Sequence, residues 1–194
     1  MEMTTNIVQL PQTLDSLNTL LLKHGVDMSK WESIYPEISQ KFLADLNNKE
    51  FYLVEEGAGL VRYLNGINAH IYFSQGTKMR KLVEDKQVFT DIDGAHRELV
   101  RGFEYLAEKI KIGEKPEDAL KRGLQEELNI PSDGYTFEFT KELHEDKESP
   151  FHPGLQTRYI FYVYQVNLKK EFYNDDGYIE VEPKRSTYFI WKDL

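Results

Sequence analysis

From residue 50 onward the sequence consists of short runs of β-branched and aromatic residues, separated from one another by Gly and Asn. The first runs, within residues 51–89, are FYLVEE, GLVRYL, INAHIYF and MRKLVEDKQVF. Runs of this length between turn-forming residues are typical of antiparallel strands that follow one another in a meander. Similar runs return within residues 135–191 as YTFEFTKEL, TRYIFYVYQVNL and STYFIW. The pattern therefore predicts a domain built mainly of β-strands.

Two amphipathic helices are expected ahead of these strands. Residues 12–24 repeat leucines at helical spacing until Gly25 ends the pattern, and residues 36–48 open with Pro36 and repeat apolar side chains in the same way. The apolar positions are Leu14, Leu17, Leu21, Leu22, Ile38, Phe42 and Leu46. Monomers rarely expose such a stripe, so we expect both helices to pack onto the domain or onto a second copy of the chain in a homodimer.

The expected organisation is an N-terminal helical extension over residues 1–49 followed by one α+β domain over residues 50–194.

Composition excludes several functions. The chain has no cysteine, which excludes a thiolate nucleophile and cysteine-ligated metal. Its formal net charge of −9 argues against a nucleic-acid polymer as a partner, because binding a phosphate backbone needs a basic surface.

The sequence also favours a cytoplasmic protein with no membrane partner. No apolar run approaches the length needed to span a bilayer. The first residues, MEMTTNIVQLPQT, lack both the basic and the apolar segments of a signal peptide. A small phosphorylated partner, contacted through a metal ion, remains open.

Residues 113–130, GEKPEDALKRGLQEELNI, carry the strongest sign of chemistry. Pro116 suits a first helical turn and apolar residues recur at helical spacing after it, so we expect a helix over residues 116–128. Near its end lie two adjacent carboxylates, Glu126 and Glu127. Mg²⁺ often binds through one or two carboxylates together with substrate phosphates. Taken alone, an acidic pair is more often a solvated helix face.

The spacing of this stretch resembles the signature of the Nudix (MutT-like) hydrolase family. Its slots for Glu, Arg, an apolar residue, two adjacent Glu and a last apolar residue are filled here by Glu114, Arg122, Leu124, Glu126, Glu127 and Ile130. The resemblance covers roughly residues 58–194. Two other segments, GVDMSKW at residues 25–31 and SPFHPGL at residues 149–155, are similar to segments of a little-characterised Nudix-like group from cyanobacteria and plants.

The resemblance implies a mixed β-sheet sandwiched by helices. It also implies a hydrolase that cleaves the pyrophosphate of a nucleoside diphosphate linked to another moiety. In that role Glu126 and Glu127 are the catalytic residues and hold Mg²⁺ or Mn²⁺, while Glu114 and Arg122 tie the preceding loop to the helix.

Three positions depart from the family pattern. Glu108 stands where the family has its first Gly, Gly123 replaces the Glu that follows Arg, and Asn129 replaces the last Gly. Asn is the usual second choice for a left-handed helix cap, so its substitution is mild. Gly123 removes a carboxylate and weakens a helix by about 1 kcal/mol relative to Ala. The alternative is therefore a catalytically degenerate module that binds a nucleotide or acts through protein contacts.

Two further groups of residues are candidates for the site. The segment 144–154, HEDKESPFHPG, offers Glu148 or Glu145 as a further metal ligand, because Nudix enzymes often take one from a loop beyond the signature; a polar turn between strands is the plainer explanation. Arg97 and Arg101 lie ahead of the signature and are candidates for substrate phosphate contacts. Ordinary solvated charge at a strand edge is the plainer explanation of them.

Overall fold

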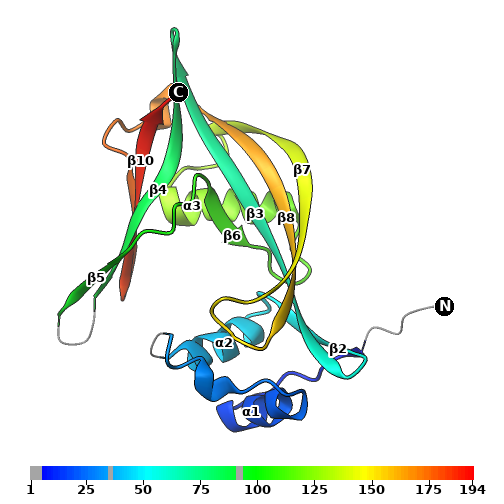
Figure 1. Ribbon diagram of the computed structural model, residues 1–194. Helices are drawn as coiled ribbons and strands as arrows, with labels where there is room; N and C mark the ends of the chain where they lie inside the picture. Colours follow the sequence, from blue (N-terminus) through cyan, green and yellow to red (C-terminus); the bar gives the residue numbers. More distant parts are fainter. Residues whose placement is uncertain (1–5, 35–36, 91–93) are drawn as a thin grey trace. The chain divides into compact units, whose positions relative to one another are not determined.

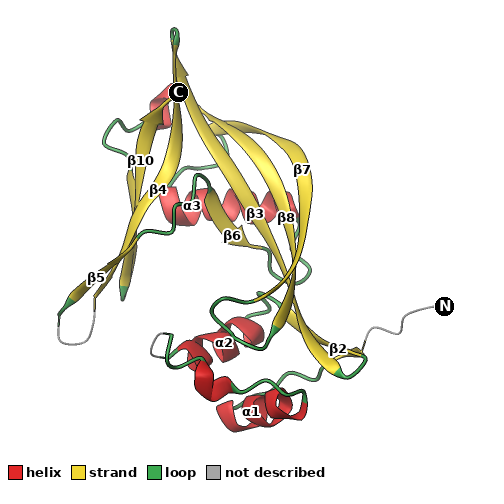
Figure 2. Cartoon of the chain, viewed as in Figure 1, coloured by secondary structure: helices red, strands yellow, loops and turns green. Residues whose placement is uncertain are grey.

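The computed structural model describes residues 6–34, 37–90 and 94–194 (Figures 1 and 2). The elements, in chain order, are β1 Asn6–Ile7, α1 Leu14–Lys23, η1 Met28–Lys30, α2 Ile38–Asn47, β2 Tyr52–Glu56, β3 Gly59–Gln75, β4 Lys78–Thr90, β5 His96–Leu99, β6 Leu106–Lys109, α3 Pro116–Leu128, β7 Tyr135–Glu148, β8 Gln156–Leu168, η2 Lys170–Phe172, β9 Tyr178–Glu182 and β10 Arg185–Asp193. The predicted α+β class is confirmed. In the described ranges, no helix has both the length and the apolar character needed to cross a membrane.

The two predicted N-terminal helices are confirmed as α1 and α2. Helix α1 begins with a capping box, in which the Thr13 side chain accepts from Ser16 N and the Ser16 side chain accepts from Thr13 N. It ends at the expected place, with Gly25 at φ 76°. Glu32 caps α2 from outside, because its carboxylate accepts from the backbone N–H of Ser39 at 3.1 Å. The expected start of this helix at Pro36 lies outside the described residues.

The predicted antiparallel meander is also confirmed. Strand β2 pairs with β3, β3 with β4, β4 with β10, and β10 with β9, each antiparallel. The expected break between GLVRYL and INAHIYF was wrong, because both runs belong to the single strand β3 of 17 residues. A lone Gly66 in a strand weakens it without ending it. Strand β9 was not expected; it forms a hairpin with β10 over the turn at Pro183 and Lys184.

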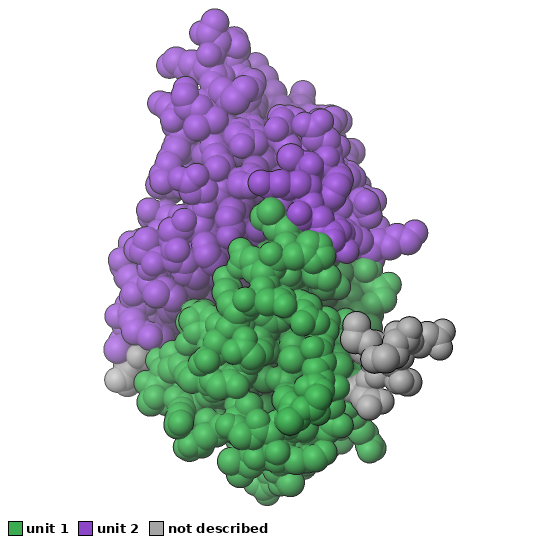
Figure 3. All heavy atoms as spheres, turned by 45° about the vertical axis from the view of Figure 1, so that its right-hand side comes forward, with its two compact units in different colours: residues 1–66, 109–114, 143–161 green, residues 67–108, 115–142, 162–194 purple. Residues whose placement is uncertain are grey.

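The chain divides into two compact units, coloured separately in Figure 3. Unit 1 comprises residues 1–66, 109–114 and 143–161, and unit 2 comprises residues 67–108, 115–142 and 162–194. Strands β3, β7 and β8 each contribute residues to both units. The boundary between residues 49 and 50 proposed from the sequence stays a prediction.

Unit 1 has its own apolar core, and both N-terminal helices contribute to it. The predicted stripe residues Leu17, Leu21, Phe42 and Leu46 are at most 1% exposed. Their cluster also contains Phe51, Leu53, Leu60, Leu64 and Leu155. The helices therefore pack onto the strands that follow them, as one branch of the prediction stated. Leu22, on the other face of α1, is 53% exposed.

The two segments GVDMSKW and SPFHPGL meet inside unit 1. Trp31, fully buried, donates from its indole Nε1 to Pro153 O at 3.0 Å. Its ring lies edge-on to His152, with ring centroids 4.8 Å apart, and lies 5.0 Å from the ring of Phe42. Arg62, 5% exposed, donates from Nη1 to His152 Nδ1 at 3.3 Å. We call this group of Trp31, Phe42, Arg62, His152 and Pro153 the tryptophan junction.

Unit 2 contains the predicted helix α3. Its buried positions Ala119, Leu120, Leu124 and Leu128 form the expected apolar stripe. Further core residues of unit 2 are Ile67, Ala69, Ile71, Phe73, Leu82, Val83, Leu106, Val163, Tyr164, Val166 and Phe189. The stripe fixes the rotation of α3 about its axis, and this decides which of its polar residues can reach a shared site.

Candidate functional site

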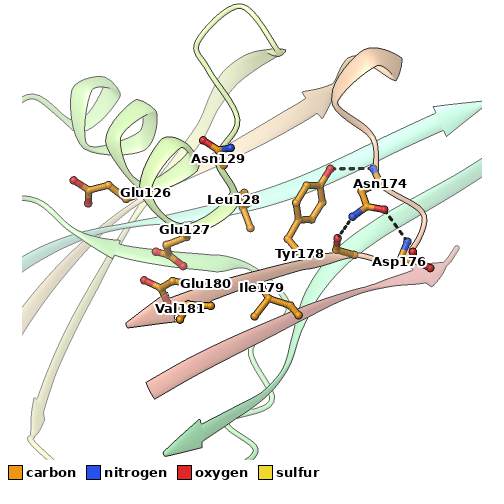
Figure 4. Close-up of a pocket in the computed structure, with 11 residues that line it drawn as sticks. Glu126, Glu127, Leu128, Asn129, Asn174, Asp176, Tyr178, Ile179, Glu180 and Val181 are labelled. Atoms are coloured by element: carbon orange, nitrogen blue, oxygen red, sulfur yellow. Dashed lines mark hydrogen bonds between the residues drawn. The ribbon is translucent and has the colours of Figure 1, made fainter. Parts of the chain in front are cut away.

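Helix α3 ends beside a pocket in unit 2. The predicted bounds 116–128 are confirmed, with Pro116 in the first turn and Asn129 at φ 54° and ψ 36° in the left-handed conformation. Pocket walls come from the last turn of this helix, the loop after η2 and strand β9 (Figure 4). Its volume is about 300 Å³, and its lining residues are Glu126, Glu127, Leu128, Asn129, Asn174, Asp176, Gly177, Tyr178, Ile179, Glu180 and Val181. We call this the carboxylate pocket, because its lining contains Glu and Asp side chains but no Lys, Arg or His.

The loop wall of the carboxylate pocket is held in one conformation by hydrogen bonds. Asn174 donates from Nδ2 to Gly177 O at 2.8 Å, and its Oδ1 accepts from Asp176 N at 3.2 Å. Trp191 Nε1 donates to Asn174 O at 2.8 Å. Gly177 is required here: its φ is +82°, and a Cβ would lie 2.0 Å from Phe189 O. This wall is therefore preformed.

Glu127 is the half-buried carboxylate of the carboxylate pocket. Its carboxylate lies next to that of Glu180, whereas Glu126 extends away from both (Figure 4). Burial, with the charges of Glu180 and Glu108, raises the pKa of Glu127 to about 9, while Arg185 and Arg101 lower it. Burial likewise raises the pKa of Glu180 above its usual range. A pair of carboxylates crowded in this way favours a nearby cation or a shared proton.

Arg122 joins two carboxylates that come from different elements. Its Nη1 donates to Glu108 Oε1 on β6 at 2.8 Å and to Glu126 Oε2 on α3 at 3.3 Å. Arg122 and Glu126 are four residues apart on one helix, which places them on one face. Arg122 therefore links Glu126 on its own helix to Glu108 on β6.

Gly123 lies in a part of α3 that contacts β6 closely. A Cβ on Gly123 would lie 3.1 Å from Glu108 Cβ, 3.2 Å from Glu108 Cγ and 3.4 Å from Leu106 Cδ2. Contacts of 3.0–3.4 Å are tighter than nine in ten Cβ contacts in proteins, so the neighbouring side chain would have to move by a few tenths of an ångström. The two main departures from the family signature, Glu108 and Gly123, therefore contact each other.

Three other predicted site residues belong to unit 1. Glu114 Oε2 accepts from Lys111 N at 2.9 Å. Glu148 is the last residue of β7, and its Oε1 accepts from Gly154 N at 2.9 Å, which closes the turn before β8. Glu145 pairs with Lys147 at 2.6 Å. Segment 144–148 is strand rather than the expected loop, and a metal-ligand role for Glu148 stays a prediction.

The two predicted phosphate contacts, Arg97 and Arg101, have partners within unit 2. Arg97 is exposed on β5, and its guanidinium lies 5.0 Å from the centroid of the Phe89 ring. Arg101 forms a two-point ion pair with the buried Glu84, and its guanidinium lies 4.5 Å from the centre of the Phe103 ring. Neither side chain lines the carboxylate pocket.

The chemistry of the carboxylate pocket fits a hard divalent cation that also binds substrate phosphates. Carboxylate oxygens are the ligands that Mg²⁺ prefers, and this ion commonly keeps water or phosphate in its other positions. Within the described part of the chain, no group of three or more His, Asp or Glu side chains is placed to hold a metal ion. The protein side chains therefore form only part of a coordination shell.

Sequence reasoning did not find Glu180 as a neighbour of Glu127. The signal was present: residues 178–182, YIEVE, alternate apolar and acidic side chains before Pro183 and Lys184, which is typical of a strand leading into a hairpin turn. The approach of Glu108 to Gly123 had no local signal, because it depends on how β6 packs against α3.

No protein-family model matches this sequence, and no curated protein matches it. Several solved structures are similar. A protein of Deinococcus radiodurans is 20% identical over 66% of this chain and 65% of that chain, just under two thirds of its length, with a TM-score of 0.39. The Ap4A hydrolase of C. elegans, in a binary complex, is 15% identical over 68% of this chain and 79% of that chain, with a TM-score of 0.36. The NUDIX domain of Shewanella oneidensis NrtR, complexed with ADP ribose, is 11% identical over 66% and 71%, with a TM-score of 0.42. At these TM-scores the likeness carries no functional argument.

Proposed function

We propose that this chain is a Nudix-type hydrolase that cleaves the pyrophosphate of a nucleoside diphosphate linked to another moiety, with Mg²⁺ or Mn²⁺ as the cofactor. The observation that supports this most is the position of Glu127. Its carboxylate comes from the helix that carries the signature and lies beside a second carboxylate, Glu180, in a preformed pocket of about 300 Å³. Residues with strongly perturbed pKa values in a cleft are typical of functional sites.

The acidic lining explains why a cation is part of the proposal. A pyrophosphate group carries negative charge, and the lining of the carboxylate pocket contains no Lys, Arg or His. An anionic substrate would therefore meet no positive side chain in this lining, and a bound cation would supply the missing positive charge. A bound divalent ion neutralises and orients the pyrophosphate and lowers the pKa of a bound water.

The chain's own residues would then have separate tasks. Glu127 would hold the ion beside Glu180, and Glu126 would join them by turning toward the pocket from the position in which Arg122 contacts it at 3.3 Å. The wall formed by Asn174 and Gly177 would bound the space left for the substrate. Because the protein carboxylates form only part of a shell, we expect the ion to bind more tightly with a phosphorylated ligand than alone.

The second candidate is a degenerate module that binds a nucleotide without cleaving it. The missing carboxylate at Gly123 and the lack of a three-ligand group within the described residues favour this alternative. One pair of measurements, heat stability and phosphate release, distinguishes the two functions. A binding module would be stabilised against heat by a nucleotide and Mg²⁺ while releasing no phosphate.

The test is a phosphate-release screen over nucleoside di- and triphosphates, dinucleotides and nucleotide sugars, each with Mg²⁺ or Mn²⁺. Glu127→Gln should reduce metal-dependent turnover by on the order of 100-fold or more, because it removes a ligand and the charge that offsets ion dehydration. Asp118→Asn is the matched control, since it removes a carboxylate from the exposed first turn of the same helix. Equal losses in both variants, or turnover unchanged in Glu127→Gln, would place the site elsewhere.

A further inference from the structure

Compared with the signature, Glu108 adds a carboxylate and Gly123 removes one. The two residues lie next to each other in the structure. We propose that Glu108 supplies, from β6, the carboxylate that the signature lacks at Gly123, so that the acidic side chain is transposed from helix to strand rather than lost. This inference rests on the proposed function, because it assigns Glu108 a place beside the same metal-dependent site.

The first support is steric. The Cβ and Cγ atoms of Glu108 lie 3.1 and 3.2 Å from the point where a Cβ of residue 123 would be. The Glu108 side chain therefore begins in the space into which a side chain at position 123 would project. A side chain at position 123 would require Glu108 to shift by a few tenths of an ångström, so the two side chains compete for the same space.

The second support is the orientation of the Glu108 carboxylate. Its Oε1 accepts from Arg122 Nη1 at 2.8 Å, and the same nitrogen contacts Glu126 Oε2 at 3.3 Å. Both contacts involve helix residues next to or near position 123. The Glu108 carboxylate thus contacts α3 through Arg122, which it shares with Glu126.

The third support is the presence of a residue that weakens the helix. Gly in a helix interior costs about 1 kcal/mol relative to Ala. Gly123 is buried in the middle of α3, where its lack of a side chain permits the close approach of β6. Because residue 123 has no side chain, the Glu108 side chain can keep its present position. We therefore treat Gly123 and Glu108 as a pair.

The test is a cycle of three variants: Glu108→Gln, Gly123→Glu, and the exchange Glu108→Gly with Gly123→Glu in one chain. Each is compared with the unchanged protein in three measurements. These are Mn²⁺ affinity from electron paramagnetic resonance with the metal alone and with methylenediphosphonate, the melting temperature without metal, and turnover of the best substrate from the screen. Glu104→Gln is the matched control, because Glu104 is an exposed acid near β6 that pairs with Lys81.

We expect Glu108→Gln to weaken Mn²⁺ binding and lower turnover, each at least about tenfold, whereas Glu104→Gln should change neither. Gly123→Glu alone should lower the melting temperature because of its contact with Glu108. The exchanged chain should recover melting temperature, Mn²⁺ affinity and turnover relative to Gly123→Glu.

Two results would overturn the proposal in distinguishable ways. If the unchanged protein binds Mn²⁺ and turns over substrate while Glu108→Gln matches it in both, Glu108 has no role at the metal and only the transposition fails. If the unchanged protein binds no Mn²⁺ with or without methylenediphosphonate and cleaves nothing, the transposition and the proposed hydrolase fail together.

Discussion

Arg62 in unit 1 and Glu127 in unit 2 are both ionisable side chains withdrawn from water, and their surroundings differ. Arg62 donates to Thr157 Oγ1 at 3.1 Å, Tyr159 OH at 3.1 Å and Ser149 Oγ at 3.3 Å. These three hydroxyl groups accept hydrogen bonds from the guanidinium and carry no charge of their own. Glu127 instead lies beside the carboxylates of Glu180 and Glu108.

The difference shows which region serves stability and which is suited to function. A buried polar network with every member satisfied fixes a single packing arrangement. A carboxylate held next to other carboxylates costs stability, and such groups persist mainly where they bind or react. The tryptophan junction belongs to the first kind and the carboxylate pocket to the second. Substitutions in the two regions should therefore change stability in opposite directions.

The largest expected loss of stability is in the tryptophan junction. Trp31→Ala removes a fully buried ring that packs against Phe42 and His152 and also removes a hydrogen bond to Pro153 O. We expect the free energy of unfolding to fall by about 3–5 kcal/mol. Chemical denaturation measures it, with Leu22→Ala on the exposed face of α1 as the control. A loss below about 1 kcal/mol would show that the junction is not a stabilising core.

The next effect is a pH dependence that comes from His152. Burial, with the charges of Arg62 and Lys109, lowers the pKa of His152 to about 3. Arg62 can only donate, so Nδ1 of His152 must accept and the neutral ring carries its proton on Nε2. Protonation of Nδ1 would break this contact and place a second cation beside the guanidinium.

The sign follows from the two states. Between about pH 6.5 and pH 3 the unfolded chain binds a proton on His152 that the folded chain excludes, so stability is complete above pH 6.5 and is lost as the pH falls. The expected loss at pH 5 is about 2 kcal/mol. His152→Gln should have a flatter stability profile between pH 7 and pH 5 than the unchanged protein. Parallel profiles would mean that His152 is already charged in the fold.

The carboxylate pocket should respond in the opposite direction. Glu127→Gln replaces a half-buried carboxylate that Glu180 and Glu108 repel by a neutral amide of the same shape. We expect the free energy of unfolding in EDTA at pH 8 to rise by about 1 kcal/mol, although the same change removes turnover. Glu117→Gln on the first turn of α3 is the control. A loss of stability in Glu127→Gln would contradict the picture of a carboxylate kept for binding.

Local patterns predicted those parts of the structure that local chemistry determines. The bounds of α3 follow from Pro116 at its start and Asn129 at its end, and the leucine stripe predicted α1. The break expected at Gly66 was wrong, because continued pairing on both sides outweighs the weak preference of one glycine.

Contacts between distant segments could not be predicted in the same way. The sequence separated GVDMSKW from SPFHPGL, yet Trp31 and Pro153, 122 residues apart, share a hydrogen bond. Likewise, the sequence alone presents Glu108 and Gly123 as two independent departures from a signature. Only the structure shows that they are neighbours. No spacing within either segment encodes which other segment it will meet, because that depends on how strands and helices pack.

The smallest expected effect concerns Asn129, at the edge of the carboxylate pocket. Its φ of 54° lies in the left-handed region, where Gly has no steric cost and Asn has a small one. Asn129→Gly should stabilise the helix end by about 0.5 kcal/mol, reduced by loss of the contact from Gln125 Nε2 to Asn129 Oδ1 at 3.0 Å. Asn129→Ala is the matched variant, since it loses the same contact but retains a Cβ, and it should destabilise by about 1 kcal/mol. Thermal melting of the two variants separates backbone strain from the side-chain contact. If both lose stability equally, the amide contact and not the left-handed cap is what Asn129 provides.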